Sequence, residues 1–251
     1  MDVKQLCEVA LKAGEILLVS GAEIYRVEDT VTRICRSYNV EADCFVMPTG
    51  IFITVFGSNR EPISVVRRVK ARTVDLSRIE KVNSFSRSLI INPVTYEEAV
   101  KTLNGIRRTK RYHFLLRLFA AGITAFSFTI LFKGNERDAL AAFLISMFIY
   151  FVNEKISQTG MFYFFEFFIS GVIAGMGSLL AVRLFPGLNL YRIIIGAIMI
   201  LVPGVAITNA IKDALNGDIA SSTFRMAEAI FIAAAVGAGV SIALYVGFNN
   251  L

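Results

Sequence analysis

The run ILVPGVAITNAIKDALNGD, residues 200–218, begins as a membrane helix would and then breaks the pattern. Pro203 and Gly204 stand side by side within apolar sequence. The same segment then adds Thr208 and Asn209 and closes with Asp213 and Asp218. Proline lacks a backbone N–H and its ring opposes the preceding turn, so the helix is expected to open here. Freed backbone groups are tolerated at membrane depth only where protein or water satisfies them, and transporters use such broken helices to hold a solute. The alternative is an ordinary proline kink that improves packing.

The composition is that of a protein with a large membrane part. The 251 residues are 55% hydrophobic and their mean hydropathy is +0.60, which is high for a soluble domain. Residues 1–113 hold 18 Lys+Arg and 13 Asp+Glu, whereas residues 114–251 hold 8 and 7. We therefore expect an α-helical integral membrane protein with five transmembrane helices, residues 113–251, preceded by a small cytoplasmic α+β domain, residues 1–112.

Five apolar stretches of the second part fit the ~20 residues that a membrane helix needs. They cover residues 114–133, 138–154, 161–185, 190–211 and 223–247. The basic run RRTKR, residues 107–111, precedes the first stretch, and positive charge at this place favours the cytoplasmic side. The N-terminus is therefore expected in the cytoplasm. The net charge of +6 could suggest nucleic acid, but basic residues concentrate in this run before a membrane span, so we expect no nucleic-acid partner.

In the first part, the spacing of apolar residues changes from that of helices to that of strands and back. Helices are predicted at residues 3–19, 22–38, 75–90 and from Thr95, and strands at 40–47, 50–57 and 62–69. Pro48, Thr49 and Gly50 form a turn signal between the first two strands, and Thr95 with Glu98 forms a capping box. Cys7, Cys35 and Cys44 form no CxxC pair, so we expect buried thiols and neither a disulfide framework nor a metal or other cofactor.

The stretch SGAEIYRVEDT, residues 20–30, is dense in charge. Glu23, Glu28 and Asp29 could serve as acid/base groups or ligands, but no Ser/His/Asp arrangement and no Gly-rich phosphate loop accompanies them. We therefore do not expect an enzyme. Two interpretations stay open: a solvated helix face with internal Glu–Arg pairs, or a contact surface for the membrane half or a partner.

Two carboxylates lie within expected membrane spans, where a charge costs a few kcal/mol or more and indicates function. Glu166 and Glu228 each lie five residues into a span, about 7–8 Å from its cytoplasmic end, and Pro203 lies about 12 Å in. Thr208 and Asn209 fall at a similar or shallower depth, so three spans are expected to direct polar groups to one layer. The expected path for solute and proton consists of Glu166, Pro203, Gly204, Thr208, Asn209, Asp213, Asp218, Arg225 and Glu228. Either carboxylate could instead be paired with Arg225 or an asparagine.

Two further features bear on the packing of the spans. Gly171 and Gly175 form a GxxxG pair, and residues 233–239, AAAVGAG, form a second small-residue face. Such faces let helices approach closely in lipid, so a compact bundle is expected. Arg117, near the start of the first span, is expected to reach toward the headgroups.

Two stretches resemble the threonine/serine exporter family, which is ThrE-like and includes YjjP-type subunits. SGAEIYRVEDTVTRI with MPTGIFITV is similar to its N-terminal signature, and PGVAITNAIKDALNGDIASSTFRMAEAI is similar to its second one. The likeness covers most of the chain. The matching positions are Gly21, Glu23, Arg26, Glu28 and Asp29 in the first signature, and Pro203, Gly204, Thr208, Asn209, Asp213, Gly217 and Asp218 in the second.

The resemblance implies secondary export of small hydrophilic metabolites across a bacterial-type inner (plasma) membrane. Threonine and serine are the solutes of some members, and dicarboxylates such as succinate are those of others. Long members carry about ten spans and this chain carries five, so it looks like the larger half of a split transporter. The implied partner is a small membrane protein with the missing spans, or else a second copy of the chain.

Two other functions compete with transport. The chain could be a membrane-anchored sensor or regulatory subunit whose soluble domain binds a ligand or partner. It could also be an intramembrane enzyme, although no metal-ligand cluster or nucleophile–base pair is visible within the spans.

Overall fold

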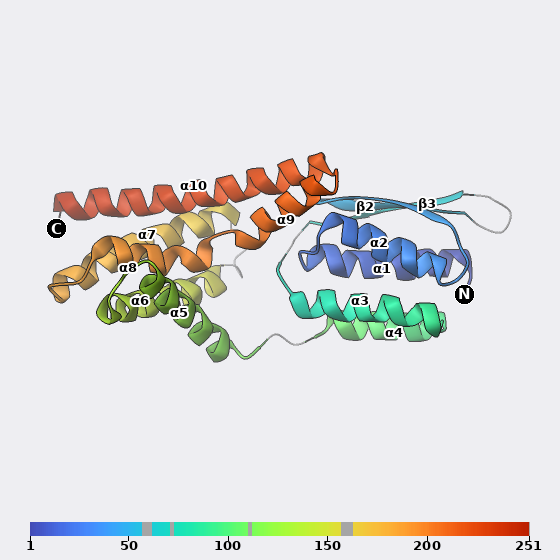
Figure 1. Cartoon of the computed structure of the whole chain (residues 1–251), viewed down its shortest axis with the longest axis horizontal. Coiled ribbons are helices and arrows are strands. Elements are labelled where there is room, and N and C mark those ends of the chain that lie inside the picture. Colours follow the sequence, from blue (N-terminus) through green and yellow to red (C-terminus); the bar gives the residue numbers. More distant parts are fainter. Residues whose placement is uncertain (57–61, 71–72, 110–111, 157–162, 251) are drawn as a thin grey trace. The chain divides into compact units, whose positions relative to one another are not determined.

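The computed structural model in Figure 1 describes residues 1–56, 62–70, 73–109, 112–156 and 163–250. Its contacts divide the chain into two compact units. Unit 1 comprises Met1–Lys110 and Val205–Ala227, and unit 2 comprises Arg111–Gly204 and Glu228–Leu251. Residues 205–227, expected within the transmembrane domain, thus group by contact with the N-terminal residues. Their place relative to the bilayer stays a prediction.

The N-terminal part of unit 1 has three layers (Figure 1): a sheet, a helix pair against it and a second helix pair beneath the first. The sheet is antiparallel, with the order β1 (Ala42–Met47), β2 (Gly50–Phe56) and β3 (Pro62–Arg68). The middle layer is α1 (Val3–Val19) and α2 (Ile24–Arg36), and the outer layer is α3 (Leu76–Ile91) and α4 (Tyr96–Arg107). All seven elements overlap the predicted ranges closely.

Local signals set the ends of these elements. The capping box before α4 is confirmed, because Thr95 accepts from the Glu98 backbone N–H and the Glu98 carboxylate accepts from the Thr95 N–H. The turn between β1 and β2 is confirmed too. Met47 pairs with Gly50 across the ladder, which leaves Pro48 and Thr49 as the two turn residues.

Helix α1 is buried more completely than its amphipathic pattern predicts. The expected face with Leu6 and Leu17 is buried, and so are Leu11 and Leu18 on other faces. The reason is its position in the middle layer, with β2 on one side and α3 and α4 on the other. The core of unit 1 therefore surrounds α1.

Unit 2 contains the apolar helices. They are α5 (Phe114–Leu131), α6 (Glu136–Ile156), α7 (Tyr163–Leu184), α8 (Leu190–Ile198) with the short 3-10 helix η2 (Met199–Leu201), and the part of α10 (Ile219–Asn250) from Glu228 onward. In the part of the chain that the structure describes, α5, α6, α7 and α10 are each long and apolar enough to cross a membrane. The fourth expected span, residues 190–211, is a broken and bent pair made of residues 190–201 and α9 (Gly204–Leu215). The break lies at Val202 and Pro203, where the sequence predicts it.

Small residues bring the helices of unit 2 together. A Cβ on Gly171 would meet the backbone of Val236, and one on Gly239 would meet the carbonyl of Phe168, so α7 and α10 touch nearly backbone to backbone. The expected packing role of both small-residue faces is confirmed.

Two polar contacts join the ends of the unit 2 helices. Arg117 on α5 donates to the Glu154 carboxylate on α6 at 3.0 and 3.1 Å and to the Tyr150 hydroxyl at 2.8 Å, and its expected reach toward the headgroups stays a prediction. Asp138, which is fully buried, accepts from the backbone N–H of Asn189 at 2.7 Å and so ties α6 to the start of α8. The sequence analysis identified neither partner.

Candidate functional site

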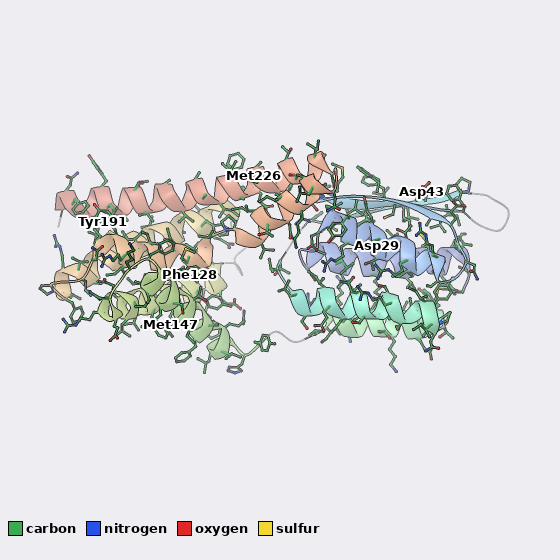
Figure 2. The ribbon with its side chains drawn as sticks, in the orientation of Figure 1. Asp29, Asp43, Phe128, Met147, Tyr191 and Met226 are labelled. Carbon is green, nitrogen blue, oxygen red and sulfur yellow. The ribbon has the colours of Figure 1, made fainter. Side chains whose placement is uncertain are left out.

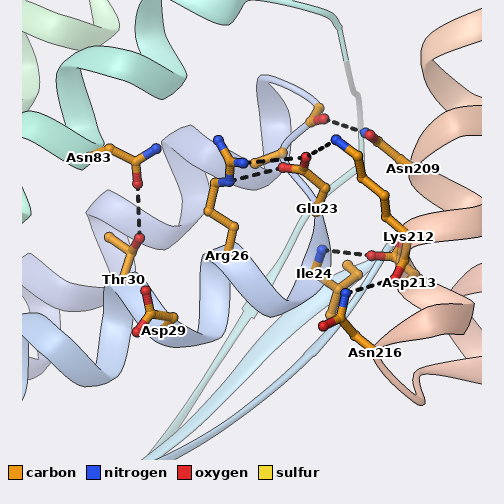
Figure 3. Close-up of polar contacts among 12 residues, drawn as sticks. Glu23, Ile24, Arg26, Asp29, Thr30, Asn83, Asn209, Lys212, Asp213 and Asn216 are labelled. Carbon is orange, nitrogen blue, oxygen red and sulfur yellow. Dashed lines mark hydrogen bonds and ion pairs between the residues drawn. The ribbon is translucent and has the colours of Figure 1, made fainter.

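The two sequence signatures meet inside unit 1. The linker between α1 and α2, residues 20–23, lies against α9 and the first turns of α10, and we call this contact the motif junction (Figure 3). Its residues are Gly21, Ala22, Glu23, Ile24 and Arg26 from the first signature, and Asn209, Lys212, Asp213 and Arg225 from the second. The side chains of the second signature satisfy backbone groups of the first.

Asp213 supplies the N-terminal cap of α2 from far along the chain. Its Oδ1 accepts from the Ile24 backbone N–H at 3.1 Å, one of the N–H groups that a helix leaves unpaired at its start. Its charge also suits the positive end of the helix dipole. The residue before the helix, Glu23, makes no side-chain cap bond, so Asp213 takes this role.

Arg225 balances the charge of Asp213. The Arg225 Nε lies 3.0 Å from the Asp213 Oδ2, and the two residues are 4% and 1% exposed. Arg225 also donates from Nη2 to the Ala22 carbonyl at 2.8 Å. Buried charges persist only where they are paired and hydrogen-bonded. Asp213 is thus one ion-pair partner of Arg225, which the sequence had offered as a possible partner of Glu166 or Glu228.

Glu23 bridges two cations at the edge of the junction. Its carboxylate lies 2.9 Å from the Lys212 Nζ on α9 and 3.0 Å from the Arg26 Nε on α2. Burial by itself would raise the pKa of Glu23, but the Lys212 hydrogen bond and the charges of Arg26 and Lys212 outweigh it and lower that pKa. Glu23 is therefore held as a carboxylate at neutral pH.

Gly21 lies in the linker, where the backbone conformation and a close neighbour both require glycine. Its φ is +83°, and a Cβ there would lie 2.9 Å from the Thr73 carbonyl oxygen. In this conformation its own carbonyl accepts from the Asn209 Nδ2 at 2.9 Å. The backbone conformation that glycine allows in the first signature therefore presents a carbonyl to the asparagine of the second.

Glu28 and Asp218 lie near the junction but make bonds of their own. The Glu28 carboxylate accepts from the Val46 backbone N–H at 2.9 Å, which ties α2 to β1. Asp218 accepts from the Ser221 N–H at 3.0 Å at the start of α10. Burial raises the pKa of Glu28, and the Asp218 and Asp213 carboxylates raise it further against the opposing effect of the Val46 bond.

This shift gives a prediction for Glu28→Gln. Because the pKa of Glu28 in the folded protein lies above its ordinary value of 4.5, the folded state binds the proton more tightly than the unfolded state. The stabilising contribution is present below pH 4.5 and is lost as the pH rises through the folded pKa. Glutamine stays neutral and can still accept from Val46. We expect the variant to unfold at a higher temperature than wild type at pH 7 and to match it near pH 4; equal melting curves at both pH values would contradict this.

The remaining predicted site residues lie outside the junction. Asp29 (Figure 2) is exposed on α2. It forms an ion pair with Arg33 on the same helix. Pro48 and Thr49 form the hairpin turn, Gly50 is the first residue of β2, and Thr208 is exposed on α9. Pro203 and Gly204 form the break and the start of α9, and Gly217, with a φ of +87°, forms the turn before α10. Glu166 and Glu228 are half-buried in unit 2.

Sequence reasoning missed Lys212 and the backbone partners at Ala22 and Ile24. Lys212 stands beside Asp213 in the second signature, and its charge is opposite to that of Glu23 in the first. These opposite charges are the signal that could have suggested the ion pair. The backbone partners carry no such signal, because every residue has a carbonyl and nearly every residue has an N–H.

Among the described residues, no group of three or more His, Cys, Asp or Glu side chains is placed to hold a metal ion. Burial raises the pKa of Cys35 and that of Cys44 to about 12, so these thiols are unreactive at neutral pH. Cys44 is half-exposed rather than fully buried.

Known proteins resemble this chain along nearly its whole length. A Mycobacterium tuberculosis (strain ATCC 25618 / H37Rv) protein named "Probable threonine/serine exporter" is 23% identical over 97% of this chain and 46% of its own length. The "Threonine/serine exporter" of Corynebacterium glutamicum is 22% identical over 97% of this chain and 51% of its own. The chain thus spans about half the length of these relatives.

A relative of similar length also matches. The "Probable succinate transporter subunit YjjP" of Klebsiella aerogenes is 23% identical over 96% of this chain and 93% of its own length. No solved structure matches the chain. The profile of the ThrE threonine/serine exporters covers residues 8–247, which include both signatures of the motif junction. The chain therefore belongs to the ThrE threonine/serine exporter family.

Proposed function

We propose that this chain is a subunit of a secondary transporter that exports small hydrophilic metabolites. In this proposal the motif junction links the α1–α2 linker to α9, the part of the broken helix that follows Pro203. The observation that carries the proposal is the position of α9. This helix begins directly after the break at Pro203, and its Asn209, Lys212 and Asp213 side chains bind the α1–α2 linker. A movement of α1 and α2 would therefore act on α9, the helix that follows the break.

The proposed solutes are amino acids of the threonine/serine type or dicarboxylates such as succinate. Two exporters named for threonine and serine and one subunit named for succinate are among the relatives, which supports this range. The solute would bind near Pro203 and Gly204, where an opened turn leaves backbone groups for polar ligands. Glu166 and Glu228 are the proposed proton-exchanging groups, because carboxylates within membrane helices serve proton relays.

The proposed topology places the N-terminal domain, residues 1–112, in the cytoplasm. The basic residues Arg107 and Arg108 before α5 support this side, while Lys110 and Arg111 lie outside the described residues. Helix α10 has 32 residues, about 48 Å, and a span needs only ~20, so its first turns with Arg225 have room outside the hydrocarbon. The missing spans would come from a small membrane partner or from a second copy of the chain.

Solute efflux from cells tests this function. We expect cells that produce the chain with its partner to release threonine or succinate faster than cells without it, and Asn209→Ala to remove most of the gain. Asn209→Ala breaks the bond to Gly21, whereas Asn216→Ala, its control three residues beyond Asp213, loses only a bond to the Lys212 carbonyl. Full efflux by Asn209→Ala and Glu228→Gln would rule out the site assignment.

A sensory or regulatory role is the alternative, and the separate core of unit 1 favours it. The buried cluster of this unit is built from α1–α4 and the sheet, as a ligand-binding domain would be. Proteoliposomes that contain the chain and its partner discriminate the two functions. Solute flux under a proton gradient supports transport, and a complete lack of flux supports regulation.

A further inference from the structure

A charged groove runs between α2 and α3, outside the motif junction. It has a volume of about 350 Å³, within the range of small-molecule sites. Arg26 contributes from α2, and α3 contributes two charged side chains, Glu80 and Arg87. Asn83 and Ser84 add an amide and a hydroxyl, and Leu76 and Ile79 add apolar surface.

The two helices run side by side in a defined register. The Thr30 hydroxyl donates to the Asn83 Oδ1 at 3.3 Å (Figure 3). The Arg33 Nη1 donates to the Ser86 hydroxyl at 3.3 Å. Because the Asn83 oxygen is engaged with Thr30, a ligand would meet the amide N–H₂ as a donor. The groove therefore offers several hydrogen-bond donors.

The charges of the lining define a class of ligand. Two guanidinium groups and one carboxylate leave an excess of one positive charge, and a guanidinium binds a carboxylate through two parallel hydrogen bonds. We propose that the α2–α3 groove is a binding site for small metabolites that carry a carboxylate, held by Arg26 and Arg87. Since Arg87 and Glu80 are exposed, the bound ions remain partly hydrated and the affinity is expected in the range of about 1 mM.

Arg26 also belongs to the motif junction, so the groove and the junction share a residue. Its Nε lies 3.0 Å from the Glu23 carboxylate, which in turn lies 2.9 Å from Lys212 on α9. A ligand carboxylate on Arg26 competes with Glu23 for the guanidinium and leaves Glu23 to Lys212. Binding in the groove thereby changes the ion pair between Glu23 and Lys212 on α9. This link to transport rests on the proposed function, whereas binding in the groove does not.

The test is calorimetric titration of the full chain in nanodiscs with L-threonine, with succinate and with butane-1,4-diol. The diol has the carbon skeleton of succinate without its carboxylates. We expect threonine or succinate to bind and the diol to give no saturable heat. Arg87→Ala should weaken binding about tenfold or more, because it removes a charged hydrogen-bond donor. Lys101→Ala, an exposed cation on α4, is the matched control and should bind as wild type.

A second variant distinguishes the two ligands. Glu80→Gln removes a partner for the ammonium group of threonine, so threonine binding should weaken, and it removes a repelling charge, so succinate binding should strengthen. Saturable binding that Arg87→Ala leaves unchanged, or no binding of either acid up to about 10 mM, would overturn the groove site. These measurements involve no flux. Efflux lost in Asn209→Ala with groove binding retained would separate the two proposals.

Discussion

Arg225→Ala is expected to lower the free energy of unfolding of the protein by about 3–5 kcal/mol, the largest effect of any single substitution considered. The change leaves the Asp213 carboxylate, 1% exposed, without its cation, and it leaves the Ala22 carbonyl without the Arg225 donor. The cost of an uncompensated buried charge exceeds the net value of the pair, because desolvation is no longer offset. Thermal unfolding in detergent, followed by circular dichroism at several denaturant concentrations, measures the loss.

The control is the double variant Arg225→Met with Asp213→Leu. It removes both charges and fills similar volume, so it should recover much of the lost stability. It still lacks the Asp213 cap on the Ile24 N–H, so recovery should remain incomplete by about 0.5–2 kcal/mol. If Arg225→Ala alone cost less than about 1 kcal/mol, the pair would be a solvated contact and the buried junction would be wrong.

Gly239→Ala is expected to destabilise the helix bundle of unit 2 by about 1–3 kcal/mol. The added methyl group would overlap the Phe168 carbonyl on α7 and lie 2.9 Å from the Val172 nitrogen. Backbone atoms cannot move aside as a side chain can, so α7 and α10 must separate along the crossing. The loss should appear as a lower melting temperature and as faster proteolysis of the protein in detergent.

Gly237→Ala on the same helix is the matched control. A Cβ at Gly237 meets nothing within 4 Å, and alanine has the higher helix propensity. This variant should melt at or slightly above the temperature of wild type. Equal stability of the two variants would show that α7 and α10 do not approach as closely as the structure has them.

The local elements were accessible to sequence reasoning because their causes are local. The capping box at Thr95, the turn at Pro48 and Thr49, and the break at Pro203 each follow from groups only a few residues apart. The full burial of α1 was not accessible in the same way. Its pattern shows an apolar stripe, but whether both faces are covered depends on layers formed by later segments.

The site shows the same division. The first signature was found as a stretch dense in charge and the second as an apolar run interrupted by Pro203 and Gly204, and the break in the fourth span was placed correctly. A contact surface for the membrane half was one of the two interpretations of the first signature. The contacting residues were not foreseen, because Asp213 was assigned to the solute and proton path and Arg225 was considered as a partner for the glutamates. Polar partners 189 residues apart, such as Ile24 and Asp213, leave no periodic trace in the sequence.

The sequence alone therefore determined the helical and strand segments, the apolar helices, the break and the family, since hydrophobic period, proline chemistry and caps act within a few residues. The tertiary structure decided which charges are paired and which are left to solvent. A buried carboxylate is stable only beside a specific cation and donor, and only the folded chain brings Arg225 and the Ile24 N–H to Asp213.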